Sequence, residues 1–130
     1  MMSDAVNGIS CPIDKVVNLF NKKWTVQIIR DMFFGKKRFK EFQEDKPKLS
    51  NKVLSECLKD LEENGLVKKE IVSTSPVLTE YYLTEKGRSL NRIIYEMAVF
   101  ALDKGNYKEY SDESVKDEIR ENFRKACDIE

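Results

Sequence analysis

The chain has 130 residues, in which 23 lysines and arginines balance 23 aspartates and glutamates to a formal net charge of zero. This length accommodates one domain, or a small domain with an oligomerisation arm, and excludes a large enzyme. The balanced charge provides no overall basic excess of the kind that marks many nucleic-acid-binding proteins.

The sequence contains no pattern typical of catalysis or metal binding. It has no histidine, which removes Ser-His and Cys-His nucleophilic machinery and histidine-ligated zinc. None of its five glycines belongs to a GxGxxG or Walker phosphate loop. We therefore expect no enzyme, no cofactor and no metal site.

The sequence also contains no targeting or membrane-spanning signal. The first ten residues lack the basic and apolar regions of a secretion signal, and no segment approaches the ~20 apolar residues that cross a bilayer. Three widely spaced cysteines do not form a secreted disulfide framework. We expect Cys57 in the core and Cys127 in a fraying C-terminal stretch. The sequence predicts a soluble, cytoplasmic protein with no membrane partner.

The first predicted helix begins at Pro12, a residue suited to the first helical position, and runs to about Asn21, after a flexible N-terminus at residues 1–10. Cys11 lies beside the positive end of this helix and one turn from Lys15, and both favour the thiolate. Cys11 is therefore the reactive candidate. The alternative is a small apolar residue packed at a dimer seam.

Two further helices are predicted before residue 48. Residues 23–34 have a core stripe at helical spacing, and Gly35 ends that helix. The basic cluster Lys36-Lys37-Arg38 then precedes a third, shorter helix, which starts near Phe39 and is broken by Pro47. Cations beside a helix N-terminus can clamp a phosphate, although a solvated charge cluster is the alternative.

Residues 49–65 form the predicted helix around which the rest of the chain is organised. Ser50 is suited to cap its first free N–H groups, and Gly65 to end it in a left-handed turn. At 100° per residue, one face is apolar and the opposite face is polar. The apolar stripe consists of Val53, Leu54, Cys57, Leu58 and Leu61, and the polar face includes Lys52, Ser55 and Lys59. This pattern is typical of a DNA recognition helix, and also of a surface helix with a solvated face.

A β-hairpin is predicted directly after this helix, from residues 66–73 and 79–83 around a turn at 74–76. A short helix, a turn, a longer helix and a hairpin together form the layout of a winged helix-turn-helix, whose second helix enters the major groove. Between residues 12 and 69, fourteen lysines and arginines face nine acids, whereas residues 104–130 have six bases and eight acids. The local excess favours DNA contact by the first half of the chain.

The remaining chain provides more apolar surface than a small winged domain needs. Thr84 caps a long predicted helix over residues 85–104, with a wide apolar stripe. A second amphipathic helix over residues 111–127 begins at Ser111 and has a narrow apolar seam. We expect part of the long helix to pack against a second subunit, and the arm at residues 105–130 to pack across a dimer or on the preceding helix.

These segments resemble the HxlR-type branch of the MarR-like winged-helix regulators over residues 11 to about 104. The motifs are Cys11-Pro12, KKWTVQIIRDMFFGKKRFKEF at 22–42, LSNKVLSECLKDLEENGLVKKE at 49–70 and SPVLTEYYLTEKGRSL at 75–90. The resemblance implies a mainly α fold with a small β-hairpin. It also implies a homodimeric transcription factor on a pseudo-palindromic operator, with the first helix and the helices after the wing at the dimer interface.

The resemblance also suggests which residues meet double-stranded DNA. Together with Lys68 at the base of the hairpin, the candidates are Arg38, Ser50, Asn51, Lys52, Ser55, Lys59, Thr74 and Ser75. Cys11 falls at the N-terminal cysteine that some members use to sense oxidants or electrophiles. Two features depart from the family pattern: the wing tip has no arginine, and the tail after Gly105 lies outside the resemblance. The acids Asp60, Glu62 and Glu63 would be repelled by phosphate, so contact should be confined to the first two turns.

Two alternatives stay open at this point. A winged helix can be a protein interaction module without DNA binding. A regulator with inert cysteines can instead respond to a small molecule, in a pocket lined by Trp24, Tyr95 and Phe100, although such aromatics are more often core residues.

Overall fold

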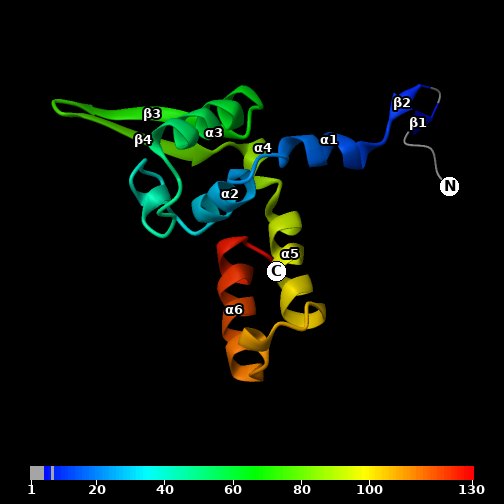
Figure 1. Ribbon diagram of the computed structural model, residues 1–130. Helices are drawn as coiled ribbons and strands as arrows, with labels where there is room; N and C mark the ends of the chain where they lie inside the picture. The colour runs from blue at the N-terminus through cyan, green and yellow to red at the C-terminus, as the bar shows by residue number, and fades with distance from the viewer. Residues whose placement is uncertain (1–4, 7) are drawn as a thin grey trace.

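The computed structural model describes residues 5, 6 and 8–130, and it has a winged-helix core from which α1 and the pair α5 and α6 extend (Figure 1). The predicted fold class, mainly α with one small hairpin in a winged helix-turn-helix, is confirmed. In chain order the elements are β1 (Ala5–Val6), β2 (Ile9–Ser10), α1 (Pro12–Leu19), α2 (Thr25–Phe33), η1 (Glu41–Gln43), α3 (Asn51–Glu63), β3 (Val67–Thr74), β4 (Val77–Leu83), α4 (Glu85–Arg88), α5 (Asn91–Lys104), η2 (Lys108–Tyr110) and α6 (Glu113–Ala126).

The main core lies between α2, α3, the base of the hairpin and the start of α5. Its buried members are Ile28, Ile29, Met32, Phe42, Leu49, Leu54, Cys57, Leu58, Leu61, Leu66, Val67, Leu83, Leu90, Ile94 and Cys127. Four of the five residues predicted for the apolar stripe of α3 are among them. Val53 is the exception, with 40% of its surface exposed, because it lies in the first turn at the outer end of the stripe.

Both predicted ends of α3 are confirmed. The Ser50 hydroxyl oxygen accepts a hydrogen bond from the Val53 N–H at 3.2 Å, which satisfies one of the free donors of the first turn. At the other end Gly65 has φ +74°, and the Leu66 N–H donates to the Leu61 carbonyl at 2.9 Å. This is a Schellman ending, which directs the chain from α3 into β3.

The third helix predicted near Phe39 is wrong, because this segment contains only the three-residue 3₁₀ turn η1. The Glu41 carboxylate accepts the backbone N–H groups of Lys37 and Arg38 at 2.9 and 2.8 Å and so begins a tight turn. Further on, the side chain of Lys46 is drawn inward to Asp31 of α2. Side-chain contacts thus hold the connection between α2 and α3, residues 34–50, in place of a regular helix.

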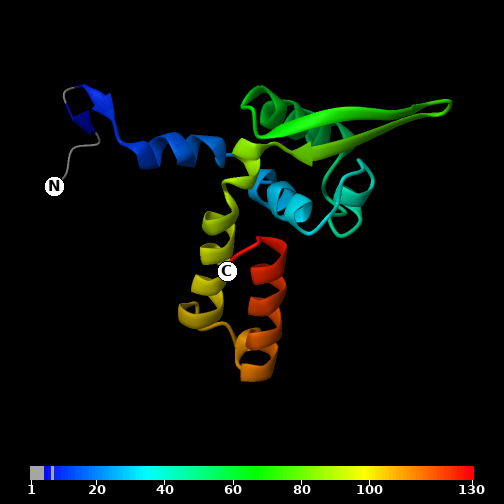
Figure 2. The same ribbon diagram turned by 180° about the vertical axis from the view of Figure 1, so that it is seen from behind.

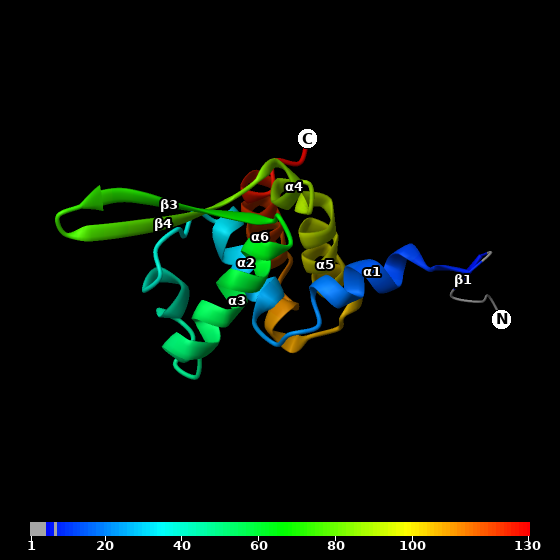
Figure 3. The same cartoon turned by 90° about the horizontal axis from the view of Figure 1, so that it is seen from above.

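The hairpin is confirmed: the first strand is shifted by one residue, from the predicted 66–73 to 67–74, and the second is longer, 77–83 in place of 79–83. Val67 pairs with Leu83 at its base and Thr74 with Val77 near its tip, with an irregularity between Ile71 and Ser73. Seen from above, the first turn of α3 and the tip of the hairpin extend to the same side of the domain (Figure 3). This arrangement is the one expected of a recognition helix beside a wing.

The single long helix predicted over residues 85–104 is wrong, because the chain breaks at residues 89–90 into α4 and α5. The predicted cap is confirmed, since the Thr84 hydroxyl oxygen accepts from the Gly87 N–H at 3.1 Å. A Cβ at Gly87 would lie 2.1 Å from the Leu66 carbonyl oxygen. The one turn of α4 therefore packs closely on the Leu66 backbone, between α3 and β3, and α5 leaves in another direction to pair with α6.

The C-terminal arm lies beside α5 of the same chain (Figures 1 and 2). The cap predicted at Ser111 is wrong by one residue, because Ser111 ends the preceding turn η2 and the Asp112 carboxylate accepts the Ser114 N–H at 2.8 Å. The fraying predicted around Cys127 is wrong as well, since this residue is 1% exposed and belongs to the core. The arm therefore completes the core from the side opposite the hairpin.

At the N-terminal end, the flexible segment expected for residues 1–10 lies partly outside the described residues. In the described part, β1 and β2 pair as two antiparallel strands, with Ala5 opposite Ser10. None of the described helices is both long and apolar enough to cross a lipid bilayer.

Candidate nucleic-acid interface

The outer face of α3 carries four of the predicted site residues. Asn51, Lys52, Ser55 and Lys59 are all exposed, and we call this group the α3 patch. Lys52, Ser55 and Lys59 recur at spacings of three and four residues on the side opposite the buried stripe, and Asn51 lies beside them in the first turn of the helix. The structure therefore brings these predicted residues together.

At the start of α3, two side chains are already occupied by local contacts. The Ser50 hydroxyl oxygen is used in the cap, and the Asn51 side-chain oxygen accepts from the Gln43 amide at 2.8 Å. Gln43 also donates to the Leu49 carbonyl at 3.2 Å. Sequence reasoning missed Gln43, because its partners lie six and eight residues further along the chain and no local pattern indicates them. The donors of the Asn51 amide and the ends of Lys52 and Ser55 still project outward.

A second charged group, the hairpin cluster, surrounds Glu80 at the base of the wing. It contains Lys37, Arg38, Lys68, Glu70, Glu80 and Tyr82. The Arg38 guanidinium donates to the buried Glu80 carboxylate at 3.2 and 3.3 Å, and the Lys37 ammonium lies 3.7 Å from it. Two cations thus face one buried acid, which leaves positive charge at the surface for a phosphate.

The ionisation of Glu80 follows from these partners. The hydrogen bond from the Tyr82 hydroxyl, with the charges of Lys37 and Arg38, holds the pKa of Glu80 below its usual 4.5, despite its desolvation. The same hydrogen bond raises the pKa of the Tyr82 phenol above its usual 10.0. The carboxylate therefore keeps its negative charge and holds Arg38 against the hairpin.

The two faces of the hairpin separate Lys68 from Lys69. Lys68 pairs in register with Tyr82, and its ammonium lies 3.6 Å from Glu70, so it belongs to the hairpin cluster. Lys69 pairs with Tyr81, whose ring packs edge-to-face on Phe42 of η1 with centroids 6.4 Å apart. Because side chains alternate along a strand, Lys69 is on the face turned toward η1 and the core, and Lys68 is on the other face.

The predicted wing residues Thr74 and Ser75 are exposed at the tip of the hairpin, apart from both clusters (Figure 1). The strands beside the tip present exposed aliphatic side chains, among them Ile71 and Val77. The tip therefore offers hydroxyl and apolar groups without a cation of its own.

Cys11 lies at the N-cap of α1, is partly exposed and forms no disulfide. The other two cysteines are buried. Burial raises the pKa of the Cys57 and Cys127 thiols, and the Cys57 sulfur lies 3.9 Å from the Thr25 hydroxyl. The core position predicted for Cys57 is confirmed, and of the three thiols Cys11 has the best access to a solvent-borne reagent.

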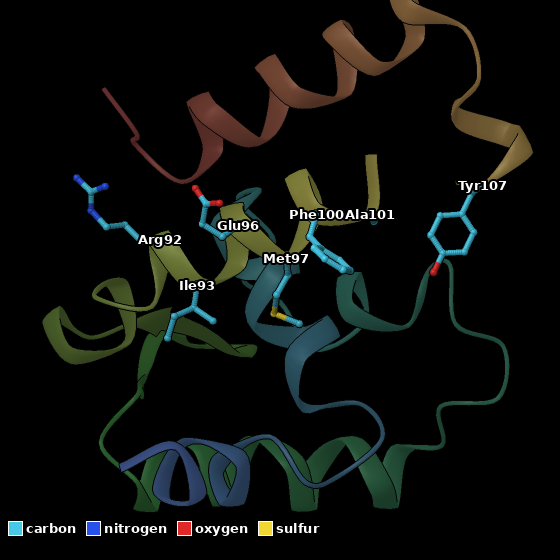
Figure 4. A pocket seen from close by; sticks show the side chains of 7 residues that line it. All are labelled: Arg92, Ile93, Glu96, Met97, Phe100, Ala101 and Tyr107. Carbon is cyan, nitrogen blue, oxygen red and sulfur yellow. The ribbon is translucent and has the colours of Figure 1, made fainter. Parts of the chain in front are cut away.

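An apolar surface runs along α1 and α5, on the side away from α3. Ile13 of α1 and Phe100 of α5 are 69% and 67% exposed. Ile93, Met97 and Phe100 project from one side of α5 and line an open surface hollow of about 720 Å³ (Figure 4). A neighbouring groove of about 460 Å³ lies between α1 and α5 and is also lined by Ile93 and Met97. We call this surface the α1–α5 face.

The three aromatic residues named for the small-molecule alternative, Trp24, Tyr95 and Phe100, do not lie together. Trp24 and Tyr95 are partly buried and pack against the core, whereas Phe100 points to solvent and lines the α1–α5 face. Among the described residues, no three metal-ligating side chains gather around a common point.

The chain is similar in sequence to known helix-turn-helix regulators. Residues 19–109 match a family described as HxlR-like helix-turn-helix. The chain is 39% identical over 94 residues to the HTH-type transcriptional regulator YvaP of Bacillus subtilis (strain 168), and the aligned region covers 72% of this chain and 87% of YvaP. It is 40% identical over 92 residues to the HTH-type transcriptional regulator YodB of the same organism, over 70% of this chain and 82% of YodB.

Solved structures match as well. The redox regulator HypR in its reduced form superposes with a TM-score of 0.69 at 32% identity, over 73% of this chain and 94% of HypR. Reduced YodB superposes with a TM-score of 0.63 at 38% identity, over 78% of this chain and 98% of that chain. The residues that match the family, 19–109, include α2, α3, the hairpin and α5.

The hairpin cluster predicts a pH-dependent contribution to stability. A carboxyl whose pKa is lowered on folding stabilises the protein above its usual pKa and loses this effect as the pH falls through the folded value. Glu80→Gln should therefore lower the melting temperature at pH 7, and its difference from the unmodified protein should shrink below pH 4. Glu63→Gln, at an exposed carboxylate of α3, is the control. Equal melting temperatures at pH 7 for Glu80→Gln and the unmodified protein would contradict this role.

Proposed function

The chain belongs to the HxlR-like helix-turn-helix family of transcriptional regulators, and we propose that it binds double-stranded DNA sequence-specifically as a homodimer, without catalysis. The observation that carries the proposal is the α3 patch, a polar and basic helix face that extends beside a wing. Of the four acids of α3, Asp60 is paired with Lys22, and Glu62 and Glu63 lie at the far end of the helix. Glu56 is exposed next to Ser55, so it is the one acid within the proposed contact region.

In the proposed complex, the first two turns of α3 enter the major groove. Asn51, Lys52 and Ser55 contact base edges, and Lys59 lies near the limit of the contact. Arg38 and Lys68 of the hairpin cluster face the phosphate backbone beside the wing. The Ser50 hydroxyl oxygen is occupied in the cap, so this residue contributes chiefly by orienting the helix. The hydroxyl groups of Thr74 and Ser75 contact the backbone beyond the groove.

The homodimer is proposed from the α1–α5 face. Exposed apolar side chains as large as Phe100 and Met97 are costly in water, and a symmetric partner would bury the same surface on both copies. Such a dimer presents two α3 helices about one helical turn, ~34 Å, apart, which matches a pseudo-palindromic operator. In this proposal residues 11–104 are the DNA-binding domain with its dimerisation helices, and residues 105–130 are a supporting arm.

A redox or electrophile signal is proposed to act through Cys11. HypR is described as a redox regulator, and a further YodB structure was solved after diamide treatment, with a TM-score of 0.57 and 36% identity to this chain. Cys11 begins α1, the helix that lines the α1–α5 face. Oxidation or alkylation there changes the packing between subunits and hence the angle between the two α3 helices.

The DNA-binding proposal predicts that Asn51→Ala with Lys52→Ala abolishes operator preference while the dimer survives. Each good base contact is worth ~1–3 kcal/mol, so affinity for DNA selected by the unmodified protein should fall at least tenfold, with little change for random DNA. Fluorescence anisotropy at several salt concentrations measures both. Lys125→Ala, at an exposed site on α6, is the control. If the variant keeps its preference for the operator, α3 is not the recognition helix. If the unmodified protein shows no salt-sensitive binding to DNA, the result favours a protein interaction module.

The dimer proposal predicts that Phe100→Glu yields a monomer, because a carboxylate would be buried unpaired at the centre of the interface. Sedimentation velocity gives the mass in solution. Val115→Glu makes the same change at an exposed aliphatic residue of α6 and should leave the dimer intact. A Phe100→Glu dimer, or an unmodified monomer, contradicts the proposed interface.

The signal proposal predicts that Cys11→Ser no longer responds to diamide, whereas the unmodified protein changes its operator affinity. Cys57→Ala is the matched control, since the buried Cys57 thiol is inaccessible in the folded protein and its loss should leave the response in place. The readout is the dissociation constant before and after treatment. A Cys11→Ser protein that responds as the unmodified protein does would point to another trigger, such as a small molecule.

A further inference from the structure

A buried ion pair joins α2 to the connection that leads into α3. Asp31 and Lys46 are each only 4% exposed, and the Lys46 ammonium donates to the Asp31 carboxylate. Two outer groups complete the network: the Arg30 guanidinium lies 2.9 Å from Asp31, and the Asp45 carboxylate lies 2.8 Å from Lys46. The Lys46 ammonium lowers the pKa of Asp45 to about 2. No other lysine or arginine among the described residues is buried to this degree.

Stability alone does not explain such a pair. Moving two charges out of water is costly, and apolar side chains of similar volume at the same positions often leave a protein equally or more stable. Two large buried residues of the connection, Phe42 and Leu49, lie on either side of Lys46 in the sequence and already provide apolar packing here. An ion pair adds a geometric restraint, because its charged groups must meet at a particular distance and orientation. Apolar contacts are non-directional and allow the packed segments to shift relative to each other.

Because Lys46 lies shortly before the start of α3, the geometry of its ion pair affects where that helix begins. The connection contains no regular helix beyond the three residues of η1, so separate turn hydrogen bonds and side-chain contacts hold its backbone. The Lys46 carbonyl accepts the Leu49 N–H at 2.9 Å, and Ser50, the cap of α3, is the next residue. Gln43, whose carbonyl accepts the Lys46 N–H at 3.0 Å, also contacts Asn51. A shift of Lys46 would therefore displace the first turn of α3.

We propose that Asp31 and Lys46 are positioning residues for DNA recognition: their ion pair sets the place at which the chain enters α3 and so aligns the α3 patch with base edges. The inference rests on the proposed DNA-binding function. Since base contacts depend on alignment more closely than phosphate contacts do, a loss of positioning lowers preference for the operator and leaves general DNA affinity in place.

The test replaces both charges with apolar residues, Asp31→Leu with Lys46→Met. We expect a melting temperature equal to or above that of the unmodified protein, together with a fall of about tenfold or more in the ratio of operator to random-DNA affinity. Amide hydrogen exchange in residues 36–51 should become faster while α2 stays protected. Lys46→Arg, which retains the charge, should keep most of the ratio. Glu113→Gln with Lys116→Gln removes a surface pair on α6 and serves as the control.

Each outcome separates positioning from simple stabilisation. An apolar double variant with unchanged operator preference and unchanged exchange would overturn the proposal, and so would a loss of melting temperature and of operator preference without faster exchange in the connection. Should the double variant fail to fold, Asp31→Asn with Lys46→Met provides the same comparison. If the unmodified protein shows no operator preference, the proposed function fails, while hydrogen exchange still reports whether the ion pair holds the connection.

Discussion

The burial of one face of α3 is the constraint on which the other features of this structure depend. Leu54, Leu58 and Leu61 are almost wholly removed from water against α2 and the connection. Burying an aliphatic side chain of this size stabilises the fold by about 1.5–3 kcal/mol. Rotating the helix about its axis would expose several of these side chains and lose that stabilisation for each. The outer face of α3 is therefore determined by its inner face. At its C-terminal end the same packing continues through Leu66 and so directs the hairpin to its place beside the helix.

The arrangement of charge explains how a chain with zero net charge can present a basic surface. Several acids of the winged-helix core are paired with cations of the same domain: Asp60 with Lys22, Glu80 with Arg38 and Lys37, and Asp31 with Lys46. These pairs hold separate segments together and remove negative charge from the exposed face. Net charge sums over the whole chain, including the acidic arm that packs beside α5, so it describes no particular surface.

Much of the fold could be predicted from the sequence, because the signals involved are local. The period of apolar residues, a capping hydroxyl at Ser50 or Thr84, and a left-handed glycine at Gly65 all act within about one helical turn. The start of α1, both ends of α3 and the hairpin were predictable in this way. So was the exposed face of α3, since amphipathicity alone places Lys52 and Ser55 opposite the core.

The features that sequence reasoning missed depend on residues distant in the chain. Arg38 meets Glu80 at a separation of 42 residues, and Lys46 meets Asp31 at 15, so no local pattern indicates either pair. The same holds for the 3₁₀ turn in place of a helix, for the break between α4 and α5, and for the burial of Cys127. The sequence by itself determined where α1, α2, α3 and the hairpin lie and which face of α3 is polar, because these follow from backbone preferences and side-chain period. Only the tertiary structure decided how the connection is held and which charges stay free, because those outcomes depend on which groups meet after the chain has folded.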